Sequence, residues 1–336
     1  MPRPPRRVSR QTIPCRARKM PRSMSVDADD AIARPWVTGP AAPARESNSA
    51  AAAAACEGAG LAAHVETVLP GPWLQIGTIE QFEWTRVELP VPGLPASLDG
   101  LRILHLTDLH FLRTWHPAYD DLLARVRADP PEIVAITGDF VDDKRDHTRA
   151  LPFVGRLATA LHAIVPRRVY AIHGNHDGDL IGPRLGAWGV RLITLARAEA
   201  NVRGDGAPPI ELVGFPGTER EDLDESFLRA LPPRRAGVPR VVLSHYPDFV
   251  GIAGGHAVRA DVVLAGHTHG GQIRLPTGRA IVTHDSLPQR YASGVHRLAG
   301  TWLVVGRGMG FSKLPIRMWC PAQVIDVRLR RMKEEG

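Results

Sequence analysis

Cysteine is scarce in this 336-residue sequence, which contains three of them. Cys15, Cys56 and Cys320 are far apart, form no C-x-x-C pair and leave one residue unpaired in any disulfide scheme. The sequence therefore excludes a thiolate-rich zinc or iron–sulfur site, and it favours a reducing compartment.

The sequence also lacks long apolar runs. No stretch approaches the roughly 18 uncharged apolar residues of a membrane-spanning helix. Arg6 and Arg7 resemble a twin-arginine export signal, but the residues that follow them lack the continuous apolar region that a signal peptide needs. We expect a cytoplasmic protein; peripheral membrane association and, with weaker support, export are the alternatives.

Beyond residue 45 the chain carries no excess of either charge. Its formal net charge of +7 comes from residues 1–45, which contain ten Lys or Arg and three acidic residues. The rest of the chain holds 32 basic and 32 acidic residues. Because the basic segment has only one aromatic residue, Trp36, among its charges, we expect no specific nucleic-acid partner.

Two regions of the chain differ in composition and in hydrophobic patterning. Residues 1–63 are rich in Pro, Arg, Ser and Ala, show no periodicity and include the run Ala50–Ala55. This composition predicts a disordered N-terminal extension, with a targeting arm or an extension produced by an upstream start codon as the alternatives. Strand-like stretches begin at His64, and an apolar content of 44% is enough for a full core. We therefore predict one folded domain over residues 64–336.

Three strand-then-helix units follow one another in the first half of this domain. Each joins an apolar strand pattern to an amphipathic helix pattern, at residues 102–110 and 117–127, 133–140 and 148–164, and 169–177 and 180–188. Denser strand patterns come next, at residues 190–196, 210–215, 240–247, 261–271, 279–284, 301–308 and 323–330. The sequence thus predicts an α/β (α+β) fold, a four-layer α-β-β-α sandwich of two mixed β-sheets flanked by helices.

Polar side chains gather where these strand patterns end. In open α/β sheets, ligands bind outside the carboxyl ends of the strands. Taken singly, each of these residues is equally well explained as a cap or a turn residue, but five strand patterns end in this way. The candidate metal ligands are Asp108, His110, Asp139, Asn175, His245, His267 and His269.

The candidate ligands offer carboxylate, amide and imidazole donors without thiolate, which suits Mn²⁺, Fe, Zn²⁺ or Mg²⁺. Two ions about 3.5 to 4 Å apart, bridged by a carboxylate, can hold a hydroxide nucleophile and stabilise charge on phosphoryl oxygens. The sequence therefore predicts a two-metal hydrolytic centre.

The blocks D-x-H, G-D, G-N-H-D, a lone H and G-H-T-H, in this order, resemble the signature of calcineurin-like metallophosphoesterases over residues 85–330. The resemblance implies two divalent ions, with Mn²⁺ as the first choice. It implies that one ion is held by Asp108, His110 and His269, that the other is held by Asn175, His245 and His267, and that Asp139 bridges them.

The same resemblance implies roles for two further residues. His176 would be the catalytic residue that binds no metal and gives a hydrogen bond or a proton to the phosphate or the leaving group. Asp142 stands where related phosphatases have the acid that orients this histidine, although an Asp in a strand-to-helix turn is also a common cap.

Two departures argue against a phosphoprotein phosphatase. That group has an Arg after the acid that matches Asp142 and a Glu after the G-N-H triplet, whereas this chain has Asp143 and Asp177 there. The run GHTHGGQIRLP and the residues that follow it instead resemble the bacterial YaeI/YkuE-like phosphodiesterase branch.

We therefore predict a metal-dependent phosphoesterase that hydrolyses a phosphodiester or a phosphomonoester, with a nucleotide, a lipid headgroup or a sugar diphosphate as substrate. One alternative is a lipid or nucleotide-sugar pyrophosphatase at the membrane, which an exposed apolar groove beside the metals would favour. Another is a non-catalytic scaffold of the same fold. The sequence gives no indication of an oligomeric state.

Overall fold

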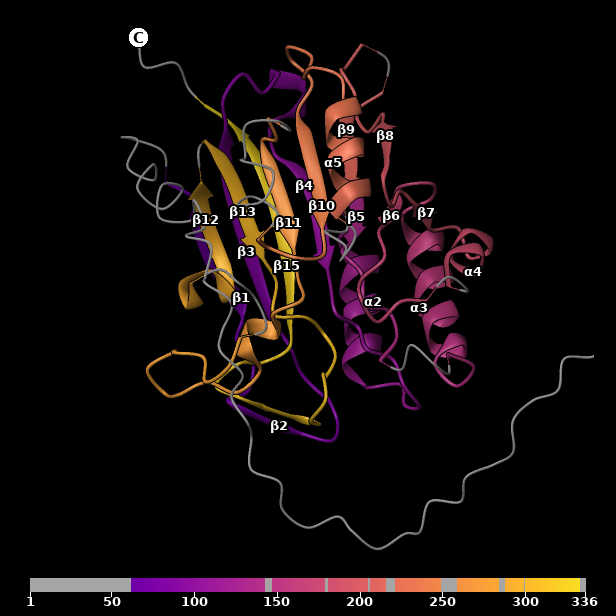
Figure 1. Ribbon diagram of the computed structural model, residues 1–336, viewed down its shortest axis with the longest axis vertical. Helices are drawn as coiled ribbons and strands as arrows, with labels where there is room; N and C mark the ends of the chain where they lie inside the picture. Colours follow the sequence, from indigo (N-terminus) through magenta and orange to yellow (C-terminus); the bar gives the residue numbers. More distant parts are fainter. Residues whose placement is uncertain are drawn as a thin grey trace, which may run out of the picture. The chain divides into compact units, whose positions relative to one another are not determined.

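The computed structural model describes residues 62–142, 147–178, 181–204, 206–215, 221–248, 259–283, 288–298 and 300–332. Within these residues the strands form two large sheets and one sheet of two short strands (Figure 1). The predicted N-terminal extension, apart from its last two residues, lies outside the described part of the chain.

The first large sheet has seven strands in the order β1-β3-β15-β4-β5-β6-β7. β4 to β7 run parallel, as strand-then-helix units require, and β15 runs antiparallel to β4. The C-terminal strand β15 thus lies inside the sheet, between β3 and β4. The strands are β1 (His64–Leu69), β3 (Glu83–Val91), β4 (Leu101–Leu106), β5 (Ile133–Ile136), β6 (Val169–Ala171), β7 (Arg191–Leu192) and β15 (Gln323–Arg331).

The second large sheet has six strands in the order β12-β13-β11-β10-β9-β8. Its four inner strands run parallel, and both edge strands run antiparallel to their neighbours. Both large sheets are therefore mixed, as predicted. The strands are β8 (Ala196–Ala200), β9 (Ile210–Phe215), β10 (Arg240–Ser244), β11 (Val262–Ala265), β12 (Gly294–Leu298) and β13 (Thr301–Val305).

Helices cover the outer face of each sheet. Apolar residues of α2 (Ala118–Ala128), α3 (Leu151–Ile164) and α4 (Ile181–Ala187) pack in one core cluster with residues of β4 and β5, and Figure 1 shows these helices grouped together. A second core cluster joins the inner faces of the two sheets, and a third joins the second sheet to α5 (Glu221–Ala230). The predicted α-β-β-α order of layers is confirmed.

Alternation along the strands explains this layering. Leu104 and Leu106 of β4 belong to the cluster beneath the helices, whereas Leu101 and Ile103 belong to the cluster between the sheets. Successive side chains of a strand point to opposite faces, so a strand that is apolar throughout is buried on both. The apolar stretches read from the sequence are the inner strands of a layered fold.

Some strand predictions need correction. The segment 279–284 does not form a strand in its described part: Ala280 makes a single bridge with Arg274, because the chain turns back tightly at Gly278. The stretch 190–196 is split, with β7 in the first sheet and β8 beginning the second. Two short strands, β2 (Leu74–Ile76) and β14 (Ile316–Met318), pair across the chain and were not predicted, because they carry too few residues for a period-two pattern.

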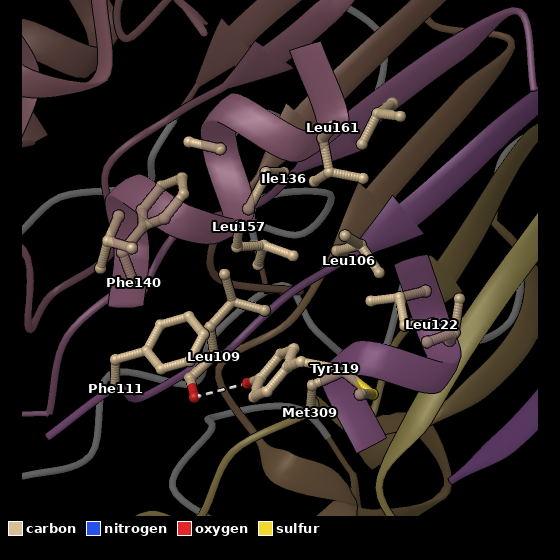
Figure 2. Packing of buried hydrophobic residues seen from close by; sticks show 14 of the residues in the cluster. Leu106, Leu109, Phe111, Tyr119, Leu122, Ile136, Phe140, Leu157, Leu161 and Met309 are labelled. Atoms are coloured by element: carbon tan, nitrogen blue, oxygen red, sulfur yellow. Dashed lines mark hydrogen bonds between the residues drawn. The ribbon is translucent and has the colours of Figure 1, made fainter. Parts of the chain in front are cut away.

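The loop after β4 is anchored to the hydrophobic core by packing and by one buried hydrogen bond. Figure 2 shows Leu109 and Phe111 of this loop packed beside Tyr119 of α2 and Met309. The hydroxyl of Tyr119, which is fully buried, donates a hydrogen bond of 3.0 Å to the carbonyl oxygen of Leu109. The backbone between two polar residues, Asp108 and His110, is therefore held by a contact from the helix layer.

Replacing Tyr119 by phenylalanine should lower the free energy of unfolding by about 1 to 3 kcal/mol, because the buried carbonyl oxygen of Leu109 would lose its partner. Urea denaturation of the wild type and of Tyr119→Phe would measure this difference. Equal midpoints with equal slopes would show that the hydrogen bond contributes nothing to stability.

Candidate metal centre

The seven predicted metal ligands lie in loops at the carboxyl ends of strands from both large sheets. Those after β4, β5 and β6 come from the first sheet, and those after β10 and β11 come from the second. The layered packing of the two sheets brings these loops together. In chain order the residues are Asp108, His110, Asp139, Asn175, His245, His267 and His269.

The backbone of these loops is bent to aim the side chains inward. Five of the seven residues have positive φ values, between 44° and 68°, which non-glycine residues seldom adopt: Asp108, His110, Asp139, His267 and His269. Such strain persists where the surrounding structure enforces it, and it is concentrated at functional sites. Gly174 allows the loops to approach, because a Cβ atom there would collide with the Asp139 carboxylate.

Four ligand atoms from three loops face a common point. The Nε2 atom of His269 lies 3.0 Å from Nε2 of His110 and 3.4 Å from Oδ1 of Asp108. The Nε2 atom of His110 lies 3.3 Å from Oδ2 of Asp139. Ligand atoms at about 2.1 Å from one ion are separated by about 3 Å, so these distances fit a single divalent cation.

A second group of four atoms lies on the other side of Asp139. Oδ1 of Asn175 lies 2.8 Å from Nε2 of His245 and 3.0 Å from Nδ1 of His267. The two imidazole nitrogens are 3.3 Å apart, and Nε2 of His245 is 3.4 Å from Oδ2 of Asp139. The same carboxylate oxygen therefore faces both groups, as a bridging ligand must.

The donor set fits two divalent metal ions. Nitrogen, carboxylate and amide oxygen donors converge without thiolate, and Asp108, His110 and Asp139 are almost fully buried. Two close pairs of imidazole nitrogens, His110 with His269 and His245 with His267, are aimed at each other. Cations between them would satisfy all four nitrogens at once.

Hydrogen bonds to residues outside the seven candidate ligands orient the ligand side chains. The Nδ1 atom of His245 donates to the carbonyl oxygen of Thr137 at 2.8 Å, which leaves Nε2 for a metal ion. The hydroxyl of Thr107 donates to Oδ2 of Asp108 at 2.7 Å, which leaves Oδ1 for the first group. Such contacts set the tautomer and the direction of each ligand.

The carboxylates and histidines of the centre control one another's protonation. Burial alone would raise the pKa of Asp139, but the charges of His245 and His110 hold it well below its usual range. Burial lowers the pKa of both histidines, yet the carboxylates outweigh this effect and raise it to about 10 for His110 and about 9 for His245. Metal ions therefore bind in competition with protons, and their affinity should rise with pH.

His176 lies beside the two groups and is held by main-chain contacts. Its amide nitrogen donates to Oδ1 of Asp139 at 2.8 Å, and its ring Nδ1 donates to the carbonyl oxygen of Asp142 at 2.6 Å. One of its ring nitrogens also lies within 4.8 Å of ligand atoms of His110 and Asp139. With Nδ1 engaged, Nε2 is the nitrogen available to a substrate.

The expected contact of Asp142 with His176 runs through a different atom. The prediction placed the Asp142 carboxylate against His176, but its Oδ1 accepts a hydrogen bond of 3.0 Å from Nδ1 of His110, and only the main-chain oxygen reaches His176. The side chain therefore orients a candidate metal ligand. Asp142 thus contacts both histidines, His110 through its side chain and His176 through its main chain. Asp143, the next residue, lies outside the described residues.

Asp177 has a structural contact in the site. Its carboxylate accepts hydrogen bonds from the main-chain nitrogens of Phe140 and Gly174, so it ties the loop after β5 to the loop after β6. The ring of His105 is also buried, and its Nε2 lies 2.9 Å from the hydroxyl of Thr137.

Arg317 is a residue of the centre that the sequence did not reveal. Its guanidinium is fully buried behind His269, with Nη2 at 3.2 Å from the histidine Nδ1 and bonded to the carbonyl oxygen of Arg307 at 2.8 Å. Burial lowers the pKa of Arg317 to about 10. The thiol of Cys320 donates to the carbonyl oxygen of His269. No sequence motif marks Arg317 or Cys320, because the residue that both contact, His269, lies about 50 positions earlier in the sequence.

Two cavities open beside the centre. The larger, of about 480 Å³, is lined by Asp139 and His176 on one side and by four apolar side chains on the other: Ile273, Ile281, Val282 and Leu314. The smaller, of about 350 Å³, is lined by His110, Asp142 and Arg113 among others. Lys313 and Leu314 line both, so the cavities adjoin along this segment.

This chain is similar to a known protein family and to several single relatives. The family model described as calcineurin-like phosphoesterase matches residues 101–271. The metallophosphoesterase YkuE of Bacillus subtilis is 25% identical over 249 residues, which cover 70% of this chain and 82% of the relative. Phosphodiesterase YaeI of Escherichia coli is 29% identical over 237 residues, covering 68% and 82%. UDP-2,3-diacylglucosamine pyrophosphatase LpxG of Chlamydia trachomatis is 26% identical over 270 residues, covering 65% and 79%. The matched family region contains all seven candidate ligands.

Proposed function

Because this chain belongs to the calcineurin-like phosphoesterase family, we propose that its seven converging side chains hold two divalent metal ions and that His176 is the catalytic residue outside the metal shell. The protein is a metal-dependent phosphoesterase, a hydrolase that acts on phosphoester bonds. The observation that carries our assignment of the site is the Oδ2 atom of Asp139, which faces both groups of ligand atoms.

The assignment gives each ligand a place. The first ion would be held by Asp108, His110 and His269, the second by Asn175, His245 and His267, with Asp139 between them. Mn²⁺ is our first choice, because mixed oxygen and imidazole donors suit it, with Fe, Zn²⁺ and Mg²⁺ as alternatives. Bound ions of this kind lower the pKa of a water molecule toward neutrality and offset charge on phosphoryl oxygens.

His176 would act on the side of the phosphoryl group or the leaving group. Its Nδ1 is held by the main-chain oxygen of Asp142, so the ring cannot turn freely and Nε2 keeps one direction. When both of its ring nitrogens carry a proton, a histidine held in this way can donate from Nε2 a hydrogen bond to a phosphoryl oxygen or a proton to a departing alkoxide. The Asp142 carboxylate would in turn keep His110 directed at the first ion.

The two adjoining cavities favour a phosphodiester over a phosphomonoester. A diester carries a substituent on each side of its phosphorus atom. The larger cavity is lined by Asp139 and His176, and the smaller one is lined by His110. A phosphodiester could therefore place one substituent in each cavity, which agrees with the name of the relative YaeI, phosphodiesterase.

The apolar wall of the larger cavity favours a second candidate, hydrolysis of a lipid or nucleotide-sugar pyrophosphate. Ile273, Ile281 and Val282 form a surface suited to an acyl chain or another apolar group. The name of the relative LpxG, a diacylglucosamine pyrophosphatase, is compatible with this reading. The non-catalytic scaffold is less favoured, because every expected ligand and His176 come together.

We also propose where in the cell this protein is located. Among the described residues, no helix is long and apolar enough to cross a membrane. We propose a cytoplasmic protein that acts on small-molecule or lipid phosphoesters and that can associate with a membrane surface.

The proposed function is tested by removing the metals. Purified protein treated with a chelator and then dialysed should lose hydrolysis of bis(p-nitrophenyl) phosphate, and added Mn²⁺ should restore it better than added Mg²⁺. Metal analysis on the same samples should show two ions per chain before stripping. Full activity in protein shown to be free of metal would contradict the proposal.

A further inference from the structure

Exposed apolar side chains are concentrated around the metal centre. Ten large apolar side chains are exposed in the described part of the chain, and two of them, Val65 and Val68, belong to strand β1. The other eight belong to four short segments and together form what we name the apolar rim. The rim consists of Trp73, Ile76, Leu112, Leu275, Ile281, Val282, Leu314 and Trp319.

Main-chain and ring contacts join three of the four rim segments, those that carry Trp73, Leu275 and Trp319. β2 pairs with β14, with Ile76 opposite Ile316, and the indole rings of Trp73 and Trp319 lie 5.4 Å apart. The turn that carries Leu275 is attached by a hydrogen bond from the Arg274 nitrogen to the Met318 oxygen, 2.9 Å long. Figure 1 shows β2 at the lower end of the view, beyond the strands of both large sheets.

The rim borders both openings of the metal centre. Ile281 and Val282 line the larger cavity with Asp139 and His176. Leu112 lines the smaller cavity with His110, and Leu314 lines both. A surface that contacts the rim would therefore lie over the entrances through which a substrate must pass.

The charge of the rim segments has one sign. Residues 71–79, 111–117, 271–283 and 311–320 contain no Asp or Glu. They contain the exposed cations Arg113, Arg279 and Lys313. Exposed tryptophans beside cations, on an apolar surface, are the features that bind the headgroup region of an anionic membrane.

Catalysis limits what can cover this surface. A protein partner or a second copy of the chain seated on the rim would close the two cavities to substrate. A bilayer covers the rim and at the same time presents phosphate groups at the level of its headgroups. We propose that the apolar rim is a docking surface for a bilayer that contains anionic phospholipids. The choice of a bilayer rests on the proposed phosphoesterase function, whereas the rim itself does not.

Vesicle flotation of the full chain tests the proposal. The protein should float with vesicles of phosphatidylcholine and phosphatidylglycerol and much less with phosphatidylcholine alone. A triple variant, Trp73→Ser with Ile76→Ser and Leu275→Ser, should reduce the bound fraction at least about tenfold, because it removes exposed apolar area outside both cavities. Arg279→Glu should weaken binding to the anionic vesicles only.

The chain offers a matched control. Val65→Ser with Val68→Ser changes the two exposed apolar residues outside the rim and should leave flotation unchanged. The triple variant should hydrolyse bis(p-nitrophenyl) phosphate as fast as the wild type, which shows that it is folded. It also keeps the basic residues of segment 1–45, so a loss of binding belongs to the rim.

Three results would overturn the docking surface: a wild type that does not float, a triple variant that floats like the wild type, or equal losses in the triple variant and the valine control. Self-association that disappears in the triple variant without any flotation would assign the rim to a second copy and would also reject the bilayer. Flotation of a protein that lacks phosphoesterase activity would instead leave the docking surface standing and reject the proposed function.

Discussion

Asp139→Asn should reduce hydrolysis of an aryl phosphodiester by at least about 10³-fold and should lower the metal content of the purified protein. The Oδ2 atom of Asp139 lies 3.3 Å from Nε2 of His110 and 3.4 Å from Nε2 of His245, so one carboxylate oxygen serves both ligand groups. Metal ions supply several kcal/mol of charge stabilisation in such reactions, and about 4 kcal/mol corresponds to about 10³ in rate. An asparagine has the same shape but no charge to share between two cations.

Asp142→Asn is the matched control for this variant. Asp142 is an aspartate of the same loop, but its carboxylate contacts Nδ1 of His110, which is not the nitrogen that faces the ligand group. We therefore expect Asp142→Asn to reduce the rate of hydrolysis by only about 10- to 100-fold. Metal analysis and steady-state rates would be measured on both variants. An Asp139→Asn protein that keeps two ions and most of its activity would remove Asp139 from the bridging position.

His176→Ala should keep its metal and lose turnover, by about 10²- to 10⁴-fold. The ring is held by the carbonyl oxygen of Asp142 and not by an atom of either ligand group, so the two groups remain complete without it. The defect should be smaller for a p-nitrophenyl ester than for an alkyl ester, because a p-nitrophenolate departs without a proton. Rates on the two esters and the metal content distinguish a proton donor from a residue that only binds phosphate.

The neighbouring His173 supplies a control. Its ring Nδ1 lies 3.0 Å from the hydroxyl of Thr194, and His173→Ala should stay within a few-fold of wild-type turnover. Loss of metal in His176→Ala would place His176 among the ligands, which its distance from His110 and Asp139 permits. The division of roles proposed above would then be wrong.

The layered fold followed from local patterns. The three units that begin at β4, β5 and β6 were predicted because each joins a short apolar run to an amphipathic helix, and both features depend on neighbours in the sequence. The position of the candidate ligands was predicted for a related reason. Parallel strands end at the same edge of a sheet, so polar residues that follow Leu106, Ile136 and Ala171 must lie close together.

Two other predictions concerned features that depend on the path of the chain, which local composition does not determine. The segment 279–284 has the composition of a strand, but the tight turn at Gly278 folds it back on residues 273–275, with which it forms a single bridge, Arg274 with Ala280. Asp142 could be placed near His176 by its spacing, yet which of its oxygens makes the contact depends on the path of the loop.

The sequence therefore predicted the chemistry of the candidate site: oxygen and imidazole donors at strand ends, a carboxylate proposed to bridge two ions, and a histidine beside them. The buried Arg317 behind His269 and the apolar rim around the openings became visible only in the folded chain. The physical reason is distance along the sequence. Asp108 and His269 are 161 positions apart and meet because the two large sheets pack face to face. Trp73 and Trp319 are 246 positions apart and meet because β2 pairs with β14.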